Sequence, residues 1–159
     1  MSRPTDPFEL LGLPRTFELD SERVRRAYLR AVAGMHPDAG GEGEAASAIN
    51  EARDTLADPM RRARALLGAR ADAAGALPAG FLAEMLGIRE RIEEELAVEG
   101  DAARARWREW ARAREAEHQA RVAAMFRAGN EAYVPGELGQ WRYVRRLVHQ
   151  LDPGAGGPD

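Results

Sequence analysis

The tripeptide His36-Pro37-Asp38 separates two stretches of helical sequence, and this separation constrains the fold more than any other feature of the chain. Proline cannot continue an α-helix, and its ring disfavours the α conformation at the residue before it. A helix that begins at Ser21 is therefore predicted to end near Met35. The tripeptide then lies at the tip of a helical hairpin, where the side chains of His36 and Asp38 can face another protein.

Apolar residues recur at intervals of three and four on both sides of the tripeptide, as they do on the buried face of an amphipathic helix. Before it these residues are Val24, Ala27, Tyr28, Ala31, Val32 and Met35, and after it they are Ala45, Ala48, Ile49, Ala52 and Leu56. Asp58-Pro59 ends the second stretch. Two such helices joined by a short loop form an antiparallel hairpin.

The C-terminal half carries three further apolar stripes, and a segment rich in Ala, Gly and Pro over residues 71–80 sets it apart. The stripes are Phe81, Met85, Ile88, Ile92 and Leu96; then Trp107, Trp110, Ala111, His118, Val122, Met125 and Phe126; then Leu138, Trp141, Val144, Val148 and Leu151. Three helices with short connections favour an antiparallel bundle. We therefore predict an all-α protein with a helical hairpin in residues 1–70, a linker over 71–80, a three-helix bundle over 81–152 and a disordered tail over 153–159.

The composition excludes several classes of function. The chain has no cysteine, which rules out disulfides, thiolate zinc sites and iron–sulfur clusters held by thiolates. Residues 1–70 carry 11 arginines against 11 acidic residues, and residues 71–159 carry 12 against 15, so neither half has the positive charge of a nucleic-acid-binding protein. No apolar stretch approaches the length of a membrane span, and residues 1–7 lack the pattern of a targeting segment. We expect a cytoplasmic protein with no cofactor, no bound metal, and no nucleic-acid or membrane partner.

Several segments resemble the J domains, which stimulate ATP hydrolysis by DnaK-type chaperones. Residues 6–14 are similar to the first helix of a J domain, and residues 49–59 are similar to its third helix and the end of that helix. Residues 60–67 and 81–94 resemble HscB, the J-protein family dedicated to iron–sulfur cluster assembly. The resemblance implies a J domain over residues 1–70 and a co-chaperone that activates a partner ATPase without catalysis of its own.

The resemblance also implies where the chaperone binds. In this family the tripeptide, here His36, Pro37 and Asp38, contacts the ATPase and linker region of a DnaK-type or HscA-type chaperone. The helix before it ordinarily presents a basic face to an acidic surface of the same chaperone, and we expect Arg26 and Arg30 to make that contact. A helix face that is merely solvated is the alternative for these two arginines.

A second surface is predicted on the first helix of the bundle. Leu82 and Leu86 lie roughly 100° round that helix from the core stripe, and Glu90 and Glu94 continue the same row at intervals of four. The resemblance to HscB implies that this surface docks an IscU-like iron–sulfur cluster scaffold protein through Leu82, Ala83, Leu86, Glu90, Glu94 and Tyr143. The alternative is a broad core face that reaches Leu82 and Leu86.

The leading hypothesis is therefore an HscB-like co-chaperone that delivers the scaffold protein to the chaperone. Two alternatives stay open, namely a J-protein that serves a different client and an interaction scaffold that activates no ATPase. His118 lies on an apolar stripe, so we expect a core or interhelical histidine instead of a catalytic base.

Overall fold

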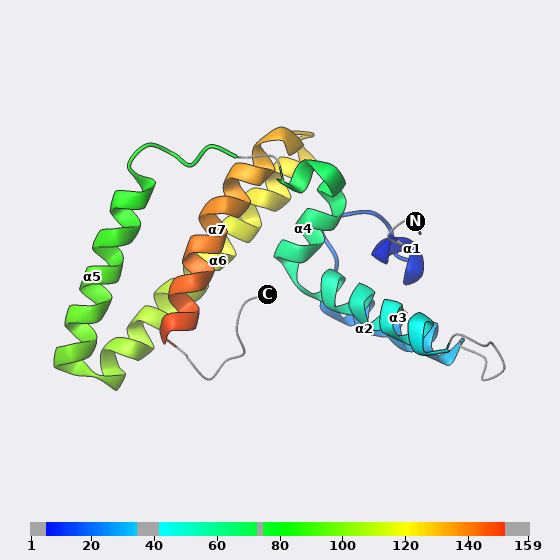
Figure 1. Ribbon diagram of the computed structural model, residues 1–159, viewed down its shortest axis with the longest axis horizontal. Helices are drawn as coiled ribbons and strands as arrows, with labels where there is room; N and C mark the ends of the chain where they lie inside the picture. Colours follow the sequence, from blue (N-terminus) through cyan, green and yellow to red (C-terminus); the bar gives the residue numbers. More distant parts are fainter. Residues whose placement is uncertain (1–5, 35–41, 73–74, 152–159) are drawn as a thin grey trace. The chain divides into compact units, whose positions relative to one another are not determined.

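The computed structural model describes residues 6–34, 42–72 and 75–151. These residues form α-helices and short 3-10 helices, with no β-strand among them (Figure 1). The all-α class predicted from the sequence is confirmed. The chain divides into two compact units, residues 1–71 and residues 72–159.

The N-terminal unit is built from helices whose starts are specified by aspartates. The helices are α1 (Pro7–Leu10), α2 (Ser21–Ala33), α3 (Glu42–Ala57) and α4 (Pro59–Leu67). The side chains of Asp6, Asp20 and Asp58 accept hydrogen bonds from backbone N–H groups in the first turns of α1, α2 and α4. These N–H groups have no partner inside the helix, so each aspartate stabilises the start of its helix.

The helices α2 and α3 lie side by side as a hairpin and pack with α1 around one apolar core (Figure 1). The buried residues of this core are Phe8, Leu11, Leu13, Leu19, Val24, Ala27, Ile49, Ala52 and Leu56. The predicted hairpin is confirmed, but the prediction that Val32 belongs to the core is wrong because its side chain is exposed. At about 100° per residue, Val32 lies about 80° round the helix from Val24, at the edge of the buried face.

A buried arginine joins the connection between α1 and α2 to the end of α3. The guanidinium of Arg62 on α4 donates a hydrogen bond of 3.0 Å to the carbonyl oxygen of Leu56. It also donates to the carbonyl oxygens of Phe17 at 2.7 Å and Leu19 at 3.1 Å. Burial lowers the pKa of Arg62, but an arginine keeps its charge in proteins. Arg62 therefore holds in place the segment that leads into α2.

The C-terminal unit contains three long helices, α5 (Phe81–Glu99), α6 (Asp101–Arg127) and α7 (Val134–Leu151). The short 3-10 helices η1 (Gly68–Asp72) and η2 (Glu131–Tyr133) precede α5 and α7 in the chain. Figure 1 shows α6 and α7 side by side in opposite directions, and α6 turns back from the end of α5 at Gly100 and leaves it at an angle. Gly100 has a φ of 57°, a left-handed conformation that favours glycine at this turn.

One apolar core joins the three long helices. Its buried residues are Phe81, Met85, Ile88, Ile92, Ala103, Trp107, Val144, Leu147 and Leu151. Leu147 lies outside the predicted stripe of α7. Because α7 packs against both α5 and α6, its buried surface is wider than a single stripe. The side chain of Val148, which is on the predicted stripe, lies outside the described residues.

The segment before α5 is held against the start of α7. Gly75 and Gly136 approach so closely that a Cβ atom added to Gly75 would lie 2.1 Å from the backbone nitrogen of Gly136. Leu77 packs against the core of the C-terminal unit. Residues 75–77 therefore belong to the packed structure of this unit and fix where α5 begins.

Candidate partner-binding surfaces

Helix α5 turns one apolar surface to the core and a second one to solvent. Phe81 and Met85 are buried, whereas Leu82 is 53% exposed and Leu86 is 58% exposed. Ala83, which lies between them in the sequence, is exposed as well. The alternative in which Leu82 and Leu86 broaden the core is therefore wrong, and the first half of α5 carries an exposed apolar patch.

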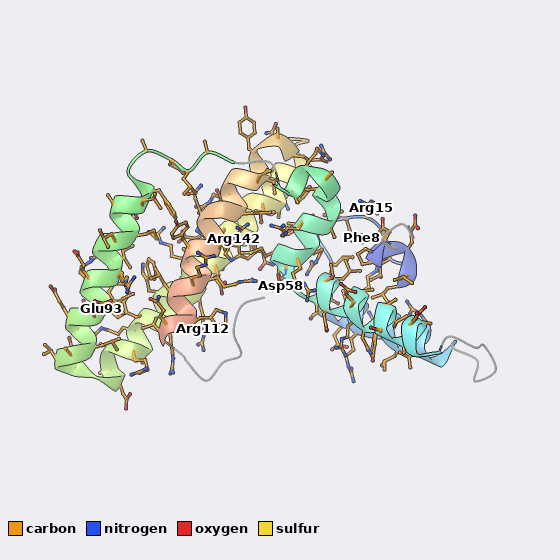
Figure 2. The ribbon with its side chains drawn as sticks, viewed as in Figure 1. Phe8, Arg15, Asp58, Glu93, Arg112 and Arg142 are labelled. Atoms are coloured by element: carbon orange, nitrogen blue, oxygen red, sulfur yellow. The ribbon has the colours of Figure 1, made fainter. Side chains whose placement is uncertain are left out.

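The second half of the same surface is acidic. Glu90 and Glu94 are exposed, and within the described residues neither of them forms an ion pair. Arg89 and Glu93, the latter labelled in Figure 2, form an ion pair with each other at 3.0 Å on the neighbouring row. Because Glu93 neutralises the positive charge of Arg89, the negative charges of Glu90 and Glu94 on this surface are left unbalanced.

Tyr143 on α7 lies beside the start of this surface. Its ring contacts the ring of Phe81 edge-on, with centroids 5.8 Å apart and planes at 82°, which is a favourable geometry for an aromatic pair. Tyr143 nevertheless stays exposed. The structure thus brings Tyr143 close to the residue that precedes Leu82. We call the following set the α5 face: Leu82, Ala83, Leu86, Glu90, Glu94 and Tyr143.

The solvent side of α2 is strongly basic. Arg23, Arg26 and Arg30 are exposed, and none of them forms an ion pair in the part of the chain that the structure describes. Arg25 has a partner, because it lies 3.6 Å from the carboxylate of Glu22. Arg26 and Arg30 therefore keep their charges available to an acidic partner.

His36, Pro37 and Asp38 lie outside the described residues. Helix α2 ends at Ala33 and α3 begins at Glu42, and the tripeptide lies between these two helices in the sequence. The binding of a chaperone by these three residues stays a prediction.

A polar cluster with a buried histidine and a buried glutamate joins α6 to α7. His118 is buried, as predicted, and its Nδ1 atom lies 2.6 Å from Oε1 of Glu137. The same oxygen accepts a hydrogen bond of 2.5 Å from Nε of Arg121. Burial on its own raises the pKa of Glu137, but the hydrogen bonds from His118 and Arg121 and the positive charge of Arg121 outweigh burial, so the pKa is lowered. Glu137 is therefore ionised, and His118 acts as an interhelical hydrogen-bond donor.

A pocket of about 370 Å³ lies beside this cluster, between α5, α6 and α7. Its lining consists of Phe81, Glu84, Met85, Arg114, His118, Arg121, Glu137, Gln140 and Val144. Both arginines are engaged in ion pairs, Arg121 with Glu137 and Arg114 with Glu117. Their charges are therefore already matched within the protein.

The described residues contain no group of three or more His, Asp or Glu side chains placed to hold a metal ion. No helix in the described part of the chain combines the length and the apolar character that a membrane span requires.

Comparison with known proteins gives relatives along nearly the whole chain, although no protein-family model matches it. The co-chaperone protein HscB homologue of Burkholderia mallei is 31% identical over 162 residues, which cover 91% of this chain and 90% of the relative. The homologue of Paraburkholderia phymatum is 30% identical over 158 residues, again covering 91% of this chain and 90% of the relative.

Solved structures share the fold. The chaperone HscB from Vibrio cholerae has a TM-score of 0.79 at 24% identity and covers 94% of this chain and 96% of that chain. The human co-chaperone HscB has a TM-score of 0.79 at 23% identity, and the match covers 96% of this chain and 83% of the human chain. The Jac1 co-chaperone of Saccharomyces cerevisiae has a TM-score of 0.73 at 20% identity, with 99% of both chains covered. The predicted fold, a J domain followed by a C-terminal helical domain, is confirmed.

The family predicted from the sequence is confirmed by these relatives. The relatives are co-chaperones by name, so the prediction that the chain is a co-chaperone is confirmed. The chain belongs to the HscB co-chaperone family.

Proposed function

We propose that this co-chaperone stimulates the ATPase of a DnaK-type chaperone through His36, Pro37 and Asp38 and brings an iron–sulfur cluster scaffold protein to it through the α5 face. The observation that carries the proposal is the α5 face itself, in which an exposed apolar patch continues into carboxylates without ion-pair partners in the described chain. In this proposal residues 1–70 act as the J domain and residues 81–152 bind the scaffold protein. The division of the chain into two compact units supports this assignment.

The α5 face favours a partner surface that is apolar at one end and basic at the other. Leu82 and Leu86 lose their contact with water when a partner covers them. This burial contributes a binding free energy of roughly 25 cal/mol per Å² of apolar surface. Glu90 and Glu94 attract basic side chains, which aligns the partner along the helix. Tyr143 adds an aromatic side chain, a residue type enriched in binding hot spots. The apolar half therefore supplies affinity, and the acidic half supplies orientation.

The basic side of α2 favours a chaperone with an acidic docking surface. Arg26 and Arg30 are exposed on the helix that leads to the tripeptide. Charges of this kind mainly raise the association rate, and physiological salt screens them beyond about 8 Å. Once the chaperone is held, His36, Pro37 and Asp38 meet its ATPase and linker region. The groups that hydrolyse ATP belong to the chaperone.

The two binding surfaces lie on one chain, and this linkage is the basis of delivery. A scaffold protein bound to the α5 face meets a chaperone bound to the J domain at a high effective concentration, because both are tethered to the same molecule. The co-chaperone thereby couples the arrival of the client to ATP hydrolysis. Because the chaperone consumes ATP, we place this activity in the cytoplasm.

Isothermal titration calorimetry with the organism's own iron–sulfur scaffold protein tests the α5 face. The double variant Leu82→Ser, Leu86→Ser is expected to bind at least about tenfold more weakly, because two large apolar side chains no longer contribute. Val98→Ser is the matched control, since Val98 is on the same helix and 85% exposed but lies outside the α5 face. Equal binding by the double variant and the wild type would contradict the proposal, and no binding by the wild type would favour a different client.

A further inference from the structure

We propose that Leu29 and Val32 on α2 make an apolar contact with the same DnaK-type chaperone, beside the arginines of this helix. The inference rests on the proposed function and deepens its chaperone contact. It gives a role to two apolar side chains that the basic character of α2 does not explain.

Leu29 and Val32 form a small exposed apolar surface. Leu29 is 51% exposed and Val32 is 43% exposed. They are three residues apart on one helix, so their side chains are neighbours. Arg26 precedes Leu29 by the same interval and Arg25 precedes it by four residues, so arginines adjoin the pair. We call Arg25, Arg26, Leu29, Arg30 and Val32 the α2 patch.

The fold does not require Leu29 and Val32 to be apolar. Val24 and Ala27 already anchor α2 in the core, and the hydroxyl of Tyr28 donates a hydrogen bond of 2.9 Å to Asn50 on α3. Single exposed apolar residues are common on protein surfaces, whereas contiguous exposed apolar surface marks interaction sites. Among the described residues, the other neighbouring pair of large exposed apolar side chains on a helix lies in the α5 face.

The charge around the pair indicates an acidic partner. Helix α2 carries Arg23, Arg25, Arg26 and Arg30 against a single acidic residue, Glu22, and that residue is 3.6 Å from Arg25. A second copy of this chain would bring arginine against arginine in a two-fold contact, which disfavours a dimer through this surface. The α2 patch therefore fits a surface with an apolar centre and carboxylates around it.

The position of the α2 patch in the sequence indicates that this acidic partner is the chaperone. Val32 is four residues before His36, so a protein that binds the tripeptide is within reach of the patch. The arginines attract such a partner over a distance, and salt screens this attraction. Leu29 and Val32 contribute to the binding affinity by the burial of apolar surface, which salt does not screen. The two parts of the contact therefore respond differently to ionic strength.

Single-turnover ATP hydrolysis by the organism's own DnaK-type chaperones separates the two parts. Stimulation is measured against co-chaperone concentration at about 50 mM and about 300 mM salt. We expect Leu29→Ser, Val32→Ser to raise the half-stimulating concentration about fivefold to tenfold at both salt concentrations, without a change in maximal stimulation. We expect the double variant Arg26→Gln, Arg30→Gln to raise the half-stimulating concentration mainly at low salt.

Matched variants control for charge, exposure and folding. Val98→Ser removes an exposed valine outside both surfaces. The double variant Arg112→Gln, Arg142→Gln removes two exposed arginines of α6 and α7, which are labelled in Figure 2. Both controls are expected to match the wild type. Leu29→Met keeps an apolar side chain and is expected to keep the wild-type half-stimulating concentration, and thermal melting followed by circular dichroism checks that each variant is folded.

Four outcomes would overturn the inference. An unchanged half-stimulating concentration for the double serine variant, or a change that disappears at high salt, would refute the apolar contact while the proposed function stands. No stimulation by the wild type would refute the proposed function, and the contact with it. A wild-type dimer in sedimentation that the double serine variant abolishes would assign the patch to a second copy of the chain.

Discussion

Replacement of Glu137 by glutamine removes one buried charge from the polar cluster between α6 and α7 and leaves the size of the side chain unchanged. Glu137 is 7% exposed, and its Oε1 atom accepts hydrogen bonds from His118 at 2.6 Å and from Arg121 at 2.5 Å. Glutamine keeps a carbonyl oxygen but carries no negative charge, so both hydrogen bonds lose the contribution of that charge. We expect the C-terminal unit of Glu137→Gln to be less stable.

The magnitude follows from the two hydrogen bonds. A hydrogen bond to a charged group contributes about 1.5–3 kcal/mol, against about 1 kcal/mol between neutral groups. If each bond loses about 1 kcal/mol, the free energy of unfolding falls by about 2 kcal/mol. For a domain of this size, 1 kcal/mol corresponds to roughly 4–8 °C in melting temperature, so the expected decrease is roughly 8–16 °C.

Tryptophan fluorescence measures this change in the C-terminal unit alone, because Trp107, Trp110 and Trp141 are all of the tryptophans and lie in that unit. Unfolding by guanidinium chloride at neutral pH gives the free energies of the wild type and Glu137→Gln. Glu109→Gln, an exposed glutamate on α6, is the control and is expected to change stability by less than about 0.5 kcal/mol. A loss below about 0.5 kcal/mol for Glu137→Gln would refute the reasoning.

The pH dependence of the same pair of proteins gives a second readout. In the folded protein the pKa of Glu137 is lowered below its ordinary value of 4.5. Ionised Glu137 therefore stabilises the fold above this ordinary value, and its contribution is lost as the pH falls through the lower folded pKa. The difference in stability between the wild type and Glu137→Gln is expected to be steady from about pH 6 to pH 8 and to shrink below about pH 4. A difference that grows as the pH falls would contradict this sign.

Three further substitutions test other parts of the fold. Arg62→Met removes the donor to three backbone carbonyl oxygens, and we expect a loss of about 3 kcal/mol in the N-terminal unit, measured as faster hydrogen exchange of the α3 amides. Gly75→Ala places a Cβ atom against the backbone of Gly136, so tryptophan-fluorescence melting should show a lower melting temperature for the C-terminal unit. Gly87→Ala should raise the stability of that unit by about 0.5–1 kcal/mol in the same assay, because its Cβ meets nothing within 4 Å and alanine favours a helix. The opposite order of the two alanine variants would contradict this account of the packing.

Helix boundaries are predictable from the sequence because caps and breakers act locally. Gly100 ends α5, and Asp58-Pro59 separates α3 from α4, in each case through residues that are neighbours in the chain. Buried polar contacts are different. Glu137 meets His118 across 19 residues of sequence, and Arg62 reaches Phe17 across 45. No local sequence pattern predicts which distant group a buried side chain will contact, so these contacts are seen only in the folded structure.

The exposed surfaces of the helices are predictable in part from the apolar periodicity of the sequence. The angle of Leu82 and Leu86 from the core stripe of α5 indicates that they can lie outside the core, and the structure exposes both. The same angular argument applied to Val32 places it at the edge of the buried face of α2, although its apolar character alone suggests the core. Leu147 is buried because α7 packs against two helices at once, which a single stripe does not represent. Periodicity therefore finds the centre of a buried face more reliably than its edges.

The measurement that tests the central claim most directly is single-turnover ATP hydrolysis by the DnaK-type chaperone with the wild-type co-chaperone and with Asp38→Asn, each with and without the iron–sulfur scaffold protein. We predict that the wild type accelerates hydrolysis, that the scaffold protein raises this acceleration further, and that Asp38→Asn abolishes it. Hydrolysis at the same rate with the wild type, with Asp38→Asn and with no co-chaperone would contradict the claim.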